Sequence, residues 1–435
     1  MISRKNKVKL AEIINHKKGF AFKSKDYLQK GTPVIRVSNF TENSISPAEL
    51  KFVSEEIAET NRNVALKEHD IVIATVGSWP NNPASVVGKT ICVPKWAKNA
   101  LMNQNAVIIR VKSECVVDQK FLYYQLKSKS FSNHIIAKAQ GSANQASITL
   151  DSIFSYELDW PSVLERKKIV EILGALDDRI DLIHETNTTL ESIAQALFQS
   201  WFIDFDPVRA KAEGREPEGM DAETAALFPD SFEESDLGAI PKNWYVTNLG
   251  DAYEINPIRK LKKGELAPYL DMANVPTRGH HAAKTIMREM GSGTKFINGD
   301  TLLARITPCL ENGKTAFVDF LDDNQIGWGS TEFVVLRPKV PIPPYHGYLL
   351  ARYSPFREFA IQSMSGTSGR QRIQSNVLSR YLITIPSEAL LKVFGSVVSS
   401  IQQKITANSR QAMVLEQQRD TLLPRLISGN LQLSI

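Results

Sequence analysis

The sequence predicts an α+β fold built as an internal duplication, in which two globular units in tandem are each followed by a long helix. Three observations predict it. The segment at 148–161 is matched 225 residues later by 373–386, with similar apolar spacing and the same final proline. Runs of β-branched residues bounded by turn residues precede each copy. After each copy the apolar pattern takes a period of seven, which indicates a long helix.

The offset of 225 residues holds without a gap into the helical stretches. Leu176 lies opposite Ile401, and Leu190 lies opposite Leu415. Looser echoes precede each copy, such as the Gly-Lys-Thr triplets at 88–90 and 313–315. A duplication of this length sets the architecture before any single motif is interpreted.

Composition limits the class of protein. A chain of 435 residues is too long for one domain, and its hydrophobic (43%) and charged (23%) shares are ordinary for a globular protein. No apolar run approaches the ~18 residues that span a bilayer, and the first residues lack the apolar core of a signal peptide. Three scattered cysteines, Cys92, Cys115 and Cys309, have neither disulfide nor metal-ligand spacing. We expect a cytoplasmic protein with no membrane contact and no metal site.

Charge is distributed unevenly along the chain. Residues 1–160 carry 22 Lys and Arg against 14 Asp and Glu, and residues 237–386 carry 18 against 12. The stretch 204–236 carries 3 against 11. Two basic units favour a polyanionic partner, because neutralising phosphates is the main source of sequence-independent affinity for nucleic acid. Solvated lysines that serve only solubility are the simpler alternative.

Strands are expected where β-branched runs lie between turn residues, and the order is the same in both units. In the first unit the strands are expected at 32–37, 70–74, 84–88 and 106–111, with a helix at 121–136. In the second they are expected at 301–304, 315–318 and 333–336, with a helix near 348–362.

Strict heptads run from about 164 to 202 and again after 387, which is typical of a coiled-coil seam. Each seam contains one asparagine, a residue type that fixes register at a cost in stability. Two matched helices of this length are expected to pair with each other. The expected seam residues are Ile169, Leu173, Leu176, Ile180, Ile183, Asn187, Leu190 and Leu197, then Phe394, Val398, Ile401, Ile405, Asn408, Leu415 and Leu422.

Motifs that suggest catalysis do not meet the requirements of their chemistry. The Gly-Lys-Thr triplets lack the first glycine of a phosphate loop, because Pro83 and Pro308 stand there. The run Ile-Pro-Pro-Tyr at 342–345 lacks the Asn or Asp that would hold a target amine. The pair His280-His281 has no further ligand at metal spacing, so a surface or DNA-facing role is expected for it. We therefore expect no catalytic residue in this chain.

Four segments carry a family resemblance. Residues 165–180 (ERKKIVEILGALDDRI) and 190–202 (LESIAQALFQSWF) resemble the central conserved region of type I restriction-modification specificity subunits. Residues 227–232 (LFPDSF) and 237–244 (LGAIPKNW) resemble that family's lead-in to its second half. The resemblance covers the whole chain in order. The second helix is the more degenerate copy, with Leu-Leu-Lys at 390–392 where the first has Glu-Arg-Lys at 165–167.

The resemblance implies a division of the chain into five parts. These are a first target-recognition domain (1–160), a central conserved helix (161–203), an acidic linker (204–243), a second target-recognition domain (244–386) and a C-terminal conserved helix (387–435). Glycines and prolines in the acidic stretch favour a loosely packed connection. In this family the two helices form an antiparallel coiled coil, and the halves are related by a pseudo-two-fold axis.

The resemblance also implies a non-catalytic DNA-reading subunit. Each domain would read one half of a bipartite double-stranded DNA site, and the coiled coil would set the spacing. Two modification subunits would dock on the helices and bring S-adenosylmethionine for adenine methylation. Restriction subunits would add ATP- and Mg²⁺-dependent cleavage. No cofactor is expected on this chain itself.

Residues that read bases are expected among planar amides and guanidinium groups, with lysines and glycine-rich backbone on phosphates. The best candidates lie in two polar loops at equivalent positions, 141–145 and 366–371. The expected DNA-contacting residues are Lys17, Lys18, Lys23, Arg36, Asn39, Ser78, Asn103, Gln104, Asn144, Gln145, Arg259, Lys260, Asn274, Arg278, His280, Arg305, Lys314, Arg370 and Gln371.

Two other functions remain as alternatives at this point. A coiled-coil scaffold with non-specific DNA binding would have the same charge and helices but no sequence preference. A self-contained methyltransferase or nuclease would need a glycine-rich cofactor turn or an acidic metal cluster, and the sequence contains neither pattern.

Overall fold

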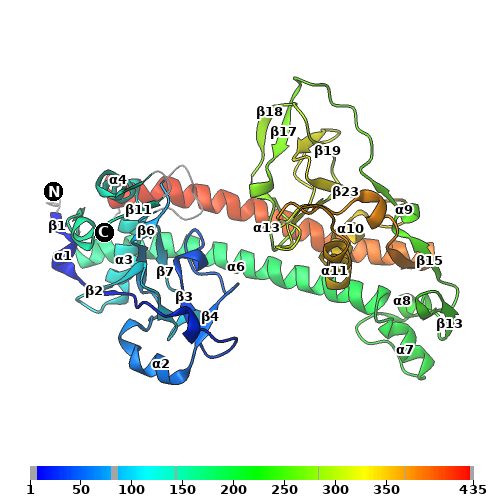
Figure 1. Ribbon diagram of the computed structural model, residues 1–435, viewed down its shortest axis with the longest axis horizontal. Helices are drawn as coiled ribbons and strands as arrows, with labels where there is room; N and C mark the ends of the chain where they lie inside the picture. The colour runs from blue at the N-terminus through cyan, green and yellow to red at the C-terminus, as the bar shows by residue number, and fades with distance from the viewer. Residues whose placement is uncertain (1–6, 80–86, 143–144, 283, 368, 432–435) are drawn as a thin grey trace. The chain divides into compact units, whose positions relative to one another are not determined.

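The computed structural model describes residues 7–79, 87–142, 145–282, 284–367 and 369–431, and the chain divides into two compact units (Figure 1). Unit 1 lies within Met1–Arg179 and Leu415–Ile435, and unit 2 is Ile180–Val414. Each unit combines a globular domain with one stretch of each of two long helices, α6 (Val163–Phe202) and α13 (Glu388–Ile427).

The globular domain of unit 1 contains short strands and helices in alternation. They are β1 (Lys7–Lys9), α1 (Leu10–Ile13), β2 (Ile14–Lys18), β3 (Thr32–Ile35), β4 (Lys51–Val53), α2 (Glu55–Thr60), β5 (Ile71–Ala74), β6 (Val76–Gly77), β7 (Thr90–Cys92), β8 (Leu101–Met102), β9 (Ala106–Val111), α3 (Val116–Leu126), α4 (Lys129–Lys138), β10 (Gln140–Ser142), β11 (Gln145–Ser147), α5 (Leu150–Phe154) and β12 (Glu157–Asp159).

Unit 2 has a similar order of elements after a short helical segment and a hairpin. They are α7 (Asp206–Ala212), α8 (Ala222–Ala226), β13 (Phe232–Ser235), β14 (Gly238–Pro241), β15 (Tyr245–Asn248), α9 (Leu249–Ala252), β16 (Tyr253–Ile255), β17 (Leu266–Leu270), β18 (Ile286–Glu289), β19 (Thr294–Phe296), β20 (Thr301–Ala304), β21 (Thr315–Phe317), β22 (Gly327–Gly329), β23 (Phe333–Pro338), α10 (Pro344–Arg352), α11 (Ser354–Gln362), α12 (Ser375–Leu378) and β24 (Leu382–Ile385).

The two domains share one sheet topology. A four-stranded antiparallel sheet has the order β2-β9-β5-β7 in unit 1 and β16-β23-β20-β21 in unit 2. A second sheet in each domain contains one parallel pair, β3 with β8 and β17 with β22. An antiparallel ribbon joins the first and last strands of each domain, β1 with β12 and β15 with β24. The predicted internal duplication is therefore confirmed at the level of strand order.

The core of each domain lies on both faces of the four-stranded sheet. All residues of β5 and β20 are buried, as their apolar runs predict for a strand covered on both sides. Helix α3 packs against β7 and β9, and α10 packs against β20, β21 and β23. In both units an Arg–Asp ion pair lies beside the sheet. Arg110 donates to Asp70 at 2.6 Å, and Arg337 donates to Asp300 at 2.6 Å.

The two predicted domain helices are each divided in two. The stretch predicted as one helix at 121–136 forms α3 and α4, because the Ser128 side chain accepts from the Phe131 amide and so starts a new helix. The stretch at 348–362 forms α10 and α11, with Pro355 in the first turn of α11, where its missing N–H does no harm. Of the strand predicted at 84–88, residues 84–86 lie outside the described residues, and Val87 and Gly88 form a turn.

The segment predicted as a loose acidic linker is folded, so that prediction is wrong. Residues 206–241 contain α7, α8 and the β13–β14 hairpin. Three of its apolar side chains, Val208, Phe228 and Ile240, are buried in the core of unit 2. The Trp201 and Phe228 rings meet edge to face at 5.1 Å between centroids. The segment is therefore attached to unit 2 by its buried apolar side chains, while its acidic side chains are exposed.

Helices α6 and α13 pack side by side and antiparallel (Figure 1). In unit 1, Arg419 near the end of α13 donates to Asp177 in the first half of α6 at 3.0 Å. In unit 2, Asn408 of α13 meets Asn187 in the second half of α6. Ser162 and Glu165 form a capping box at the start of α6, and Gly429 follows the end of α13 with φ +66°.

Candidate nucleic-acid interface

The predicted seam lies between α6 and α13, and its two asparagines contact each other. Asn408 Nδ2 donates to Asn187 Oδ1 at 2.8 Å, and Asn187 Nδ2 donates to Ser409 Oγ at 3.2 Å. The amides therefore satisfy one another inside an apolar seam, which fixes the register of the helices within unit 2. Buried seam residues are Ile169, Leu173, Ile180, Ile183, Phe394, Val398, Ile405 and Asn408, and half-buried ones are Leu176, Asn187, Leu190, Leu197, Ile401, Leu415 and Leu422.

Several residues predicted to contact DNA from unit 1 are exposed. Lys17 and Lys18 end β2, and Gly19 follows at a point where a Cβ would lie 1.9 Å from the Asn103 carbonyl oxygen. The chain can turn there only because the residue is glycine. Exposed members of the predicted set in unit 1 are Lys17, Lys18, Lys23, Gln104 and Gln145. Asn144 lies outside the described residues. The DNA contacts of these residues stay a prediction.

Other predicted contacts in unit 1 hold the domain together. Asn39 is buried, and its side chain accepts from the Arg36 amide and donates to the Ala48 carbonyl. Ser78 is buried as well. Both side chains have little exposed surface in this structure, which favours an internal role, and their DNA contacts stay a prediction. Arg36 donates to the Glu49 carbonyl and Asn103 to the Tyr27 hydroxyl, and both are half-buried.

In unit 2 the predicted residues fall into exposed and anchored groups. Lys260, Arg278 and Arg370 are exposed, and Asn274, Arg305, Lys314 and Gln371 are half-buried. Lys314 Nζ donates to the Met272 carbonyl at 2.6 Å. Arg259 Nη2 donates to both carboxylate oxygens of Asp300, at 2.9 and 2.8 Å. Arg259 is thus an internal anchor, and the prediction of a base contact is wrong for it.

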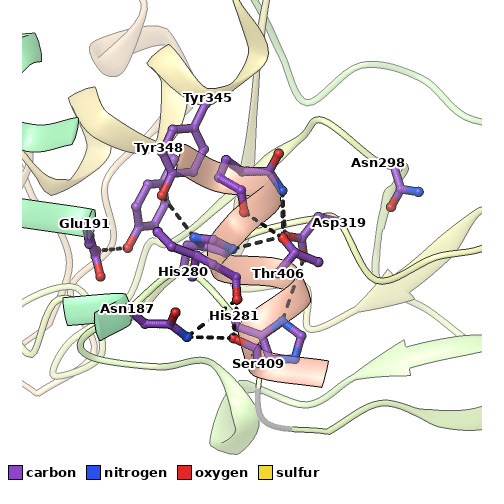
Figure 2. A network of polar contacts seen from close by, with 12 residues as sticks. Asn187, Glu191, His280, His281, Asn298, Asp319, Tyr345, Tyr348, Thr406 and Ser409 are labelled. Atoms are coloured by element: carbon purple, nitrogen blue, oxygen red, sulfur yellow. Dashed lines mark hydrogen bonds and ion pairs between the residues drawn. The ribbon is translucent and has the colours of Figure 1, made fainter. Parts of the chain in front are cut away.

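His280 is also internal, which corrects its predicted DNA-facing role. Figure 2 shows His280 within a network of polar contacts. The side chain is fully buried, with Nε2 3.0 Å from Asp319 Oδ2 and Nδ1 2.9 Å from the Tyr345 hydroxyl. Asp319 Oδ2 also accepts from Gln402 and Thr406 of α13. The network therefore joins the domain to α13 within unit 2.

The two polar loops predicted as the best reading elements occupy equivalent places. At the first, the described residues belong to β10 and β11, which pair with each other, and β11 also pairs with β6. The second is closed by the bridge Ser365–Arg372, and Arg372 also bridges Ile306. Gly141 and Gly366 both have positive φ, +154° and +131°. In unit 1 the partner strand β6 follows β5 of the four-stranded sheet, and in unit 2 the bridging residue Ile306 follows β20.

One ion pair that the sequence did not reveal supports the second loop. Arg372 donates to both carboxylate oxygens of Glu332, and these hydrogen bonds hold the pKa of Glu332 below its usual range. Next to this pair, Arg305 Nη2 donates to Gln374 Oε1 at 3.0 Å. Nothing in the local sequence signals these contacts, because the partners are 40 and 69 residues apart.

The described residues contain no group of three or more His, Cys, Asp or Glu side chains placed to hold a metal ion. Within the same part of the chain, no helix has the length and apolar character needed to cross a membrane.

Comparison with known proteins finds type I restriction enzyme specificity subunits among the relatives of this chain. A family model described as the type I restriction modification DNA specificity domain matches residues 3–192. The type I restriction enzyme HindI specificity subunit of Haemophilus influenzae is 27% identical over 427 residues, which cover 84% of this chain and 87% of the relative. The MjaIX specificity subunit of Methanocaldococcus jannaschii is 28% identical over 352 residues, covering 77% and 74%.

A solved structure supports the fold along the whole chain. The crystal structure of a type I restriction-modification S subunit from M. genitalium aligns with a TM-score of 0.54 at 15% identity. The alignment covers 98% of this chain and 96% of that chain. Two domains, each joined to a stretch of paired helices, are thus an architecture that occurs elsewhere.

Proposed function

Because this chain belongs to the family of type I restriction-modification DNA specificity subunits, we propose that it reads a bipartite DNA site, one half per globular domain. The observation that carries the proposal is the duplication of two basic domains with the same strand order, each packed on its own stretch of the helix pair. Two similar but unequal readers favour an interrupted, asymmetric site.

The proposal assigns the chemistry to other subunits. Two modification subunits would dock on the chain and use S-adenosylmethionine to methylate adenine, and restriction subunits would use ATP and Mg²⁺ to cleave DNA. This chain would direct those activities without contributing a catalytic group. The proposal places the complex in the cytoplasm, where the chromosomal DNA is accessible to it.

A methylome tests the proposal most directly. The chain is expressed with the modification subunit encoded beside it, and methylated adenines are mapped across the host chromosome. We expect one motif made of two short half-sites separated by a fixed gap. A contiguous motif would mean that only one domain reads DNA, and no motif from an intact complex would overturn the proposal.

Arg370→Ala is expected to weaken recognition of one half-site without affecting folding. Arg370 is exposed on the loop that Ser365 and Arg372 close, where a guanidinium group can approach a base edge. Loss of one such contact lowers discrimination by about 1–3 kcal/mol, and an exposed substitution changes stability by about 0.5 kcal/mol or less. The measurement is the methylation rate on the cognate site and on sites changed at each base pair.

Arg380→Ala is the matched control, because Arg380 is exposed in the same domain but lies outside that loop. Equal rates and equal site preference for the two variants would remove Arg370 from the set of base-reading residues.

A further inference from the structure

Ile258 is the most exposed large apolar side chain in the described part of the molecule, at 97%. It follows β16 and stands in a basic stretch, with Lys260, Lys262 and Lys263 all exposed. Single exposed apolar residues normally need no explanation. An isoleucine exposed as completely as Ile258 is nevertheless unusual, because isoleucine is among the residues most often buried. Ile258 differs from such residues because the loop that carries it is held in place.

The loop that carries Ile258 is anchored on both sides. Before it, the Asn256 side chain accepts from the Val335 amide and donates to Ser375, both at 2.8 Å. After it, Arg259 is bound to the buried carboxylate of Asp300. Lys295 Nζ donates to the carbonyls of Arg259 and Leu261, at 3.2 and 2.9 Å. The loop is held by side chains of the domain, so the exposure of Ile258 is built in.

Ile258 also borders an open depression of about 380 Å³. Arg259, Lys295 and Arg305 are among its lining residues, and the lining set of described residues includes no acidic side chain. The charge of Arg259 is balanced by Asp300, so a protein partner would have to supply carboxylates mainly to the exposed Lys260, Lys262 and Lys263 beside the depression. A nucleic acid supplies phosphates around every groove, so duplex DNA fits this surface better.

The first domain has a similar arrangement close to the corresponding position. Ile14 pairs with the last residue of β9, and Tyr253 pairs with the last residue of β23, so β2 and β16 correspond. Six residues after Ile14, Phe20 is 44% exposed next to Lys17, Lys18 and Lys23, and Ile258 comes five residues after Tyr253. Both domains thus present an apolar side chain among lysines, just after the same strand.

We propose that Ile258 is a specificity-determining residue that packs against a thymine methyl group in the major groove of its half-site. The proposal rests on the proposed function and deepens it. The exposed isoleucine side chain has no charge and no hydrogen-bonding group, so on duplex DNA the group that it can recognise is an apolar one. The thymine methyl is the apolar group that base pairs present there.

The test uses the full chain assembled with its modification subunits. Ile258→Ala is compared with Val340→Ala, a matched control that shortens another β-branched residue, 93% exposed in the same unit. We expect Ile258→Ala to lower affinity for the cognate site about tenfold, the order expected for one lost base contact, and to change affinity for unrelated DNA less than twofold. Ile258→Val, which keeps the branched methyl groups, should retain most of the affinity.

A second measurement identifies the methyl group. Each thymine on either strand of the half-site is replaced in turn by deoxyuridine, which removes only that methyl. At one position the replacement should weaken binding by the wild-type complex about as much as Ile258→Ala does, and should have no further effect on the variant. If the loss of affinity from deoxyuridine and the loss from Ile258→Ala are independent at every position, so that the combined loss is their product, the proposed contact is overturned.

Three further outcomes distinguish a failure of the role proposed for Ile258 from a failure of the proposed function. If the wild-type complex prefers its site but Ile258→Ala behaves like Val340→Ala, only the role of Ile258 is wrong. If Ile258→Ala lowers assembly with the modification subunits, the residue belongs to a protein interface and the inference is overturned. If the wild-type complex shows no site preference, the proposed function fails and the inference fails with it.

Discussion

Asp319→Ala is expected to lower the free energy of unfolding of unit 2 by about 3–5 kcal/mol, the range for a buried charged group removed from its partners. Asp319 Oδ2 accepts from His280, Gln402 and Thr406, and the last two lie on α13. Without the carboxylate the fully buried His280 loses the partner of its Nε2, while Gln402 and Thr406 keep only their bonds to each other and to the Gln402 carbonyl, which accounts for the large effect.

Asp319 itself does not titrate across neutral pH. Burial alone raises the pKa of Asp319, but the hydrogen bonds that its carboxylate accepts from His280 and Thr406 outweigh burial and hold the pKa well below its usual range. A carboxylate with a lowered folded pKa stabilises fully above its unfolded pKa, about 3.9, and loses that contribution only as pH falls through the folded value. The Asp319 carboxylate is therefore ionised throughout the range from pH 5 to pH 8.

Hydrogen exchange of the α13 amides around Thr406, followed in denaturant, measures the loss locally. Asp323→Ala is the control, because Asp323 is exposed four residues away. A difference between the two variants below about 1 kcal/mol, the net value of an ordinary hydrogen bond, would contradict the assigned role of the network.

Acidification below pH 6.5 is expected to destabilise unit 2 through His346. Burial lowers the pKa of His346 to about 3, and an unfolded histidine has a pKa of about 6.5. The folded pKa is depressed, so the stabilisation is complete above 6.5 and is lost as pH falls toward 3. The loss is about 1.4 kcal/mol per pH unit, or roughly 2 kcal/mol at pH 5.

The surroundings of His346 explain why the neutral ring is favoured. The rings of Phe198, Phe202 and Phe394 pack around it with centroids 5.1 to 6.3 Å away. Its Nδ1 lies within hydrogen-bonding distance of the Tyr253 hydroxyl, which can donate to a neutral imidazole. A charged imidazolium would be stranded among these aromatic rings.

His346→Gln removes the titrating group but keeps a hydrogen-bond acceptor. We expect this variant to be less stable at pH 7 and to show a flatter dependence of unfolding free energy on pH between 5 and 7. His184→Gln, at an exposed position on α6, should keep the wild-type slope. Parallel profiles for all three proteins would show that another group causes any acid sensitivity.

Features with a regular spacing could be predicted from the sequence. The duplication, the long helices and the asparagines in the seam all follow from positions that recur at 225 or seven residues. The contact between Asn187 and Asn408 did not follow, because it depends on how the two helices align. The linker was misinterpreted because its many carboxylates obscured a few apolar anchors such as Phe228.

The candidate site was less predictable than the fold. Polar residue types that suit base contacts also suit internal anchoring, and only tertiary partners decide between the two. Arg259 and His280 have acceptors that lie 41 and 39 residues away in the sequence. Ile258 could not be predicted for the opposite reason. An apolar residue in a basic loop does not belong to the hydrogen-bonding residue types that suit base contacts.

Unit 1 takes part of its core from a distant segment, and this affects how the protein is made. Leu426 is buried against the same apolar cluster as Phe121 and Leu173. During translation the first domain emerges early, but that cluster stays incomplete until the ribosome has passed Leu426. Until then the apolar face of α6 that packs in this cluster stays exposed to solvent, which favours chaperone binding or aggregation. A nonsense mutation ahead of residue 415 should therefore damage the amino-terminal domain as well as the helix it removes.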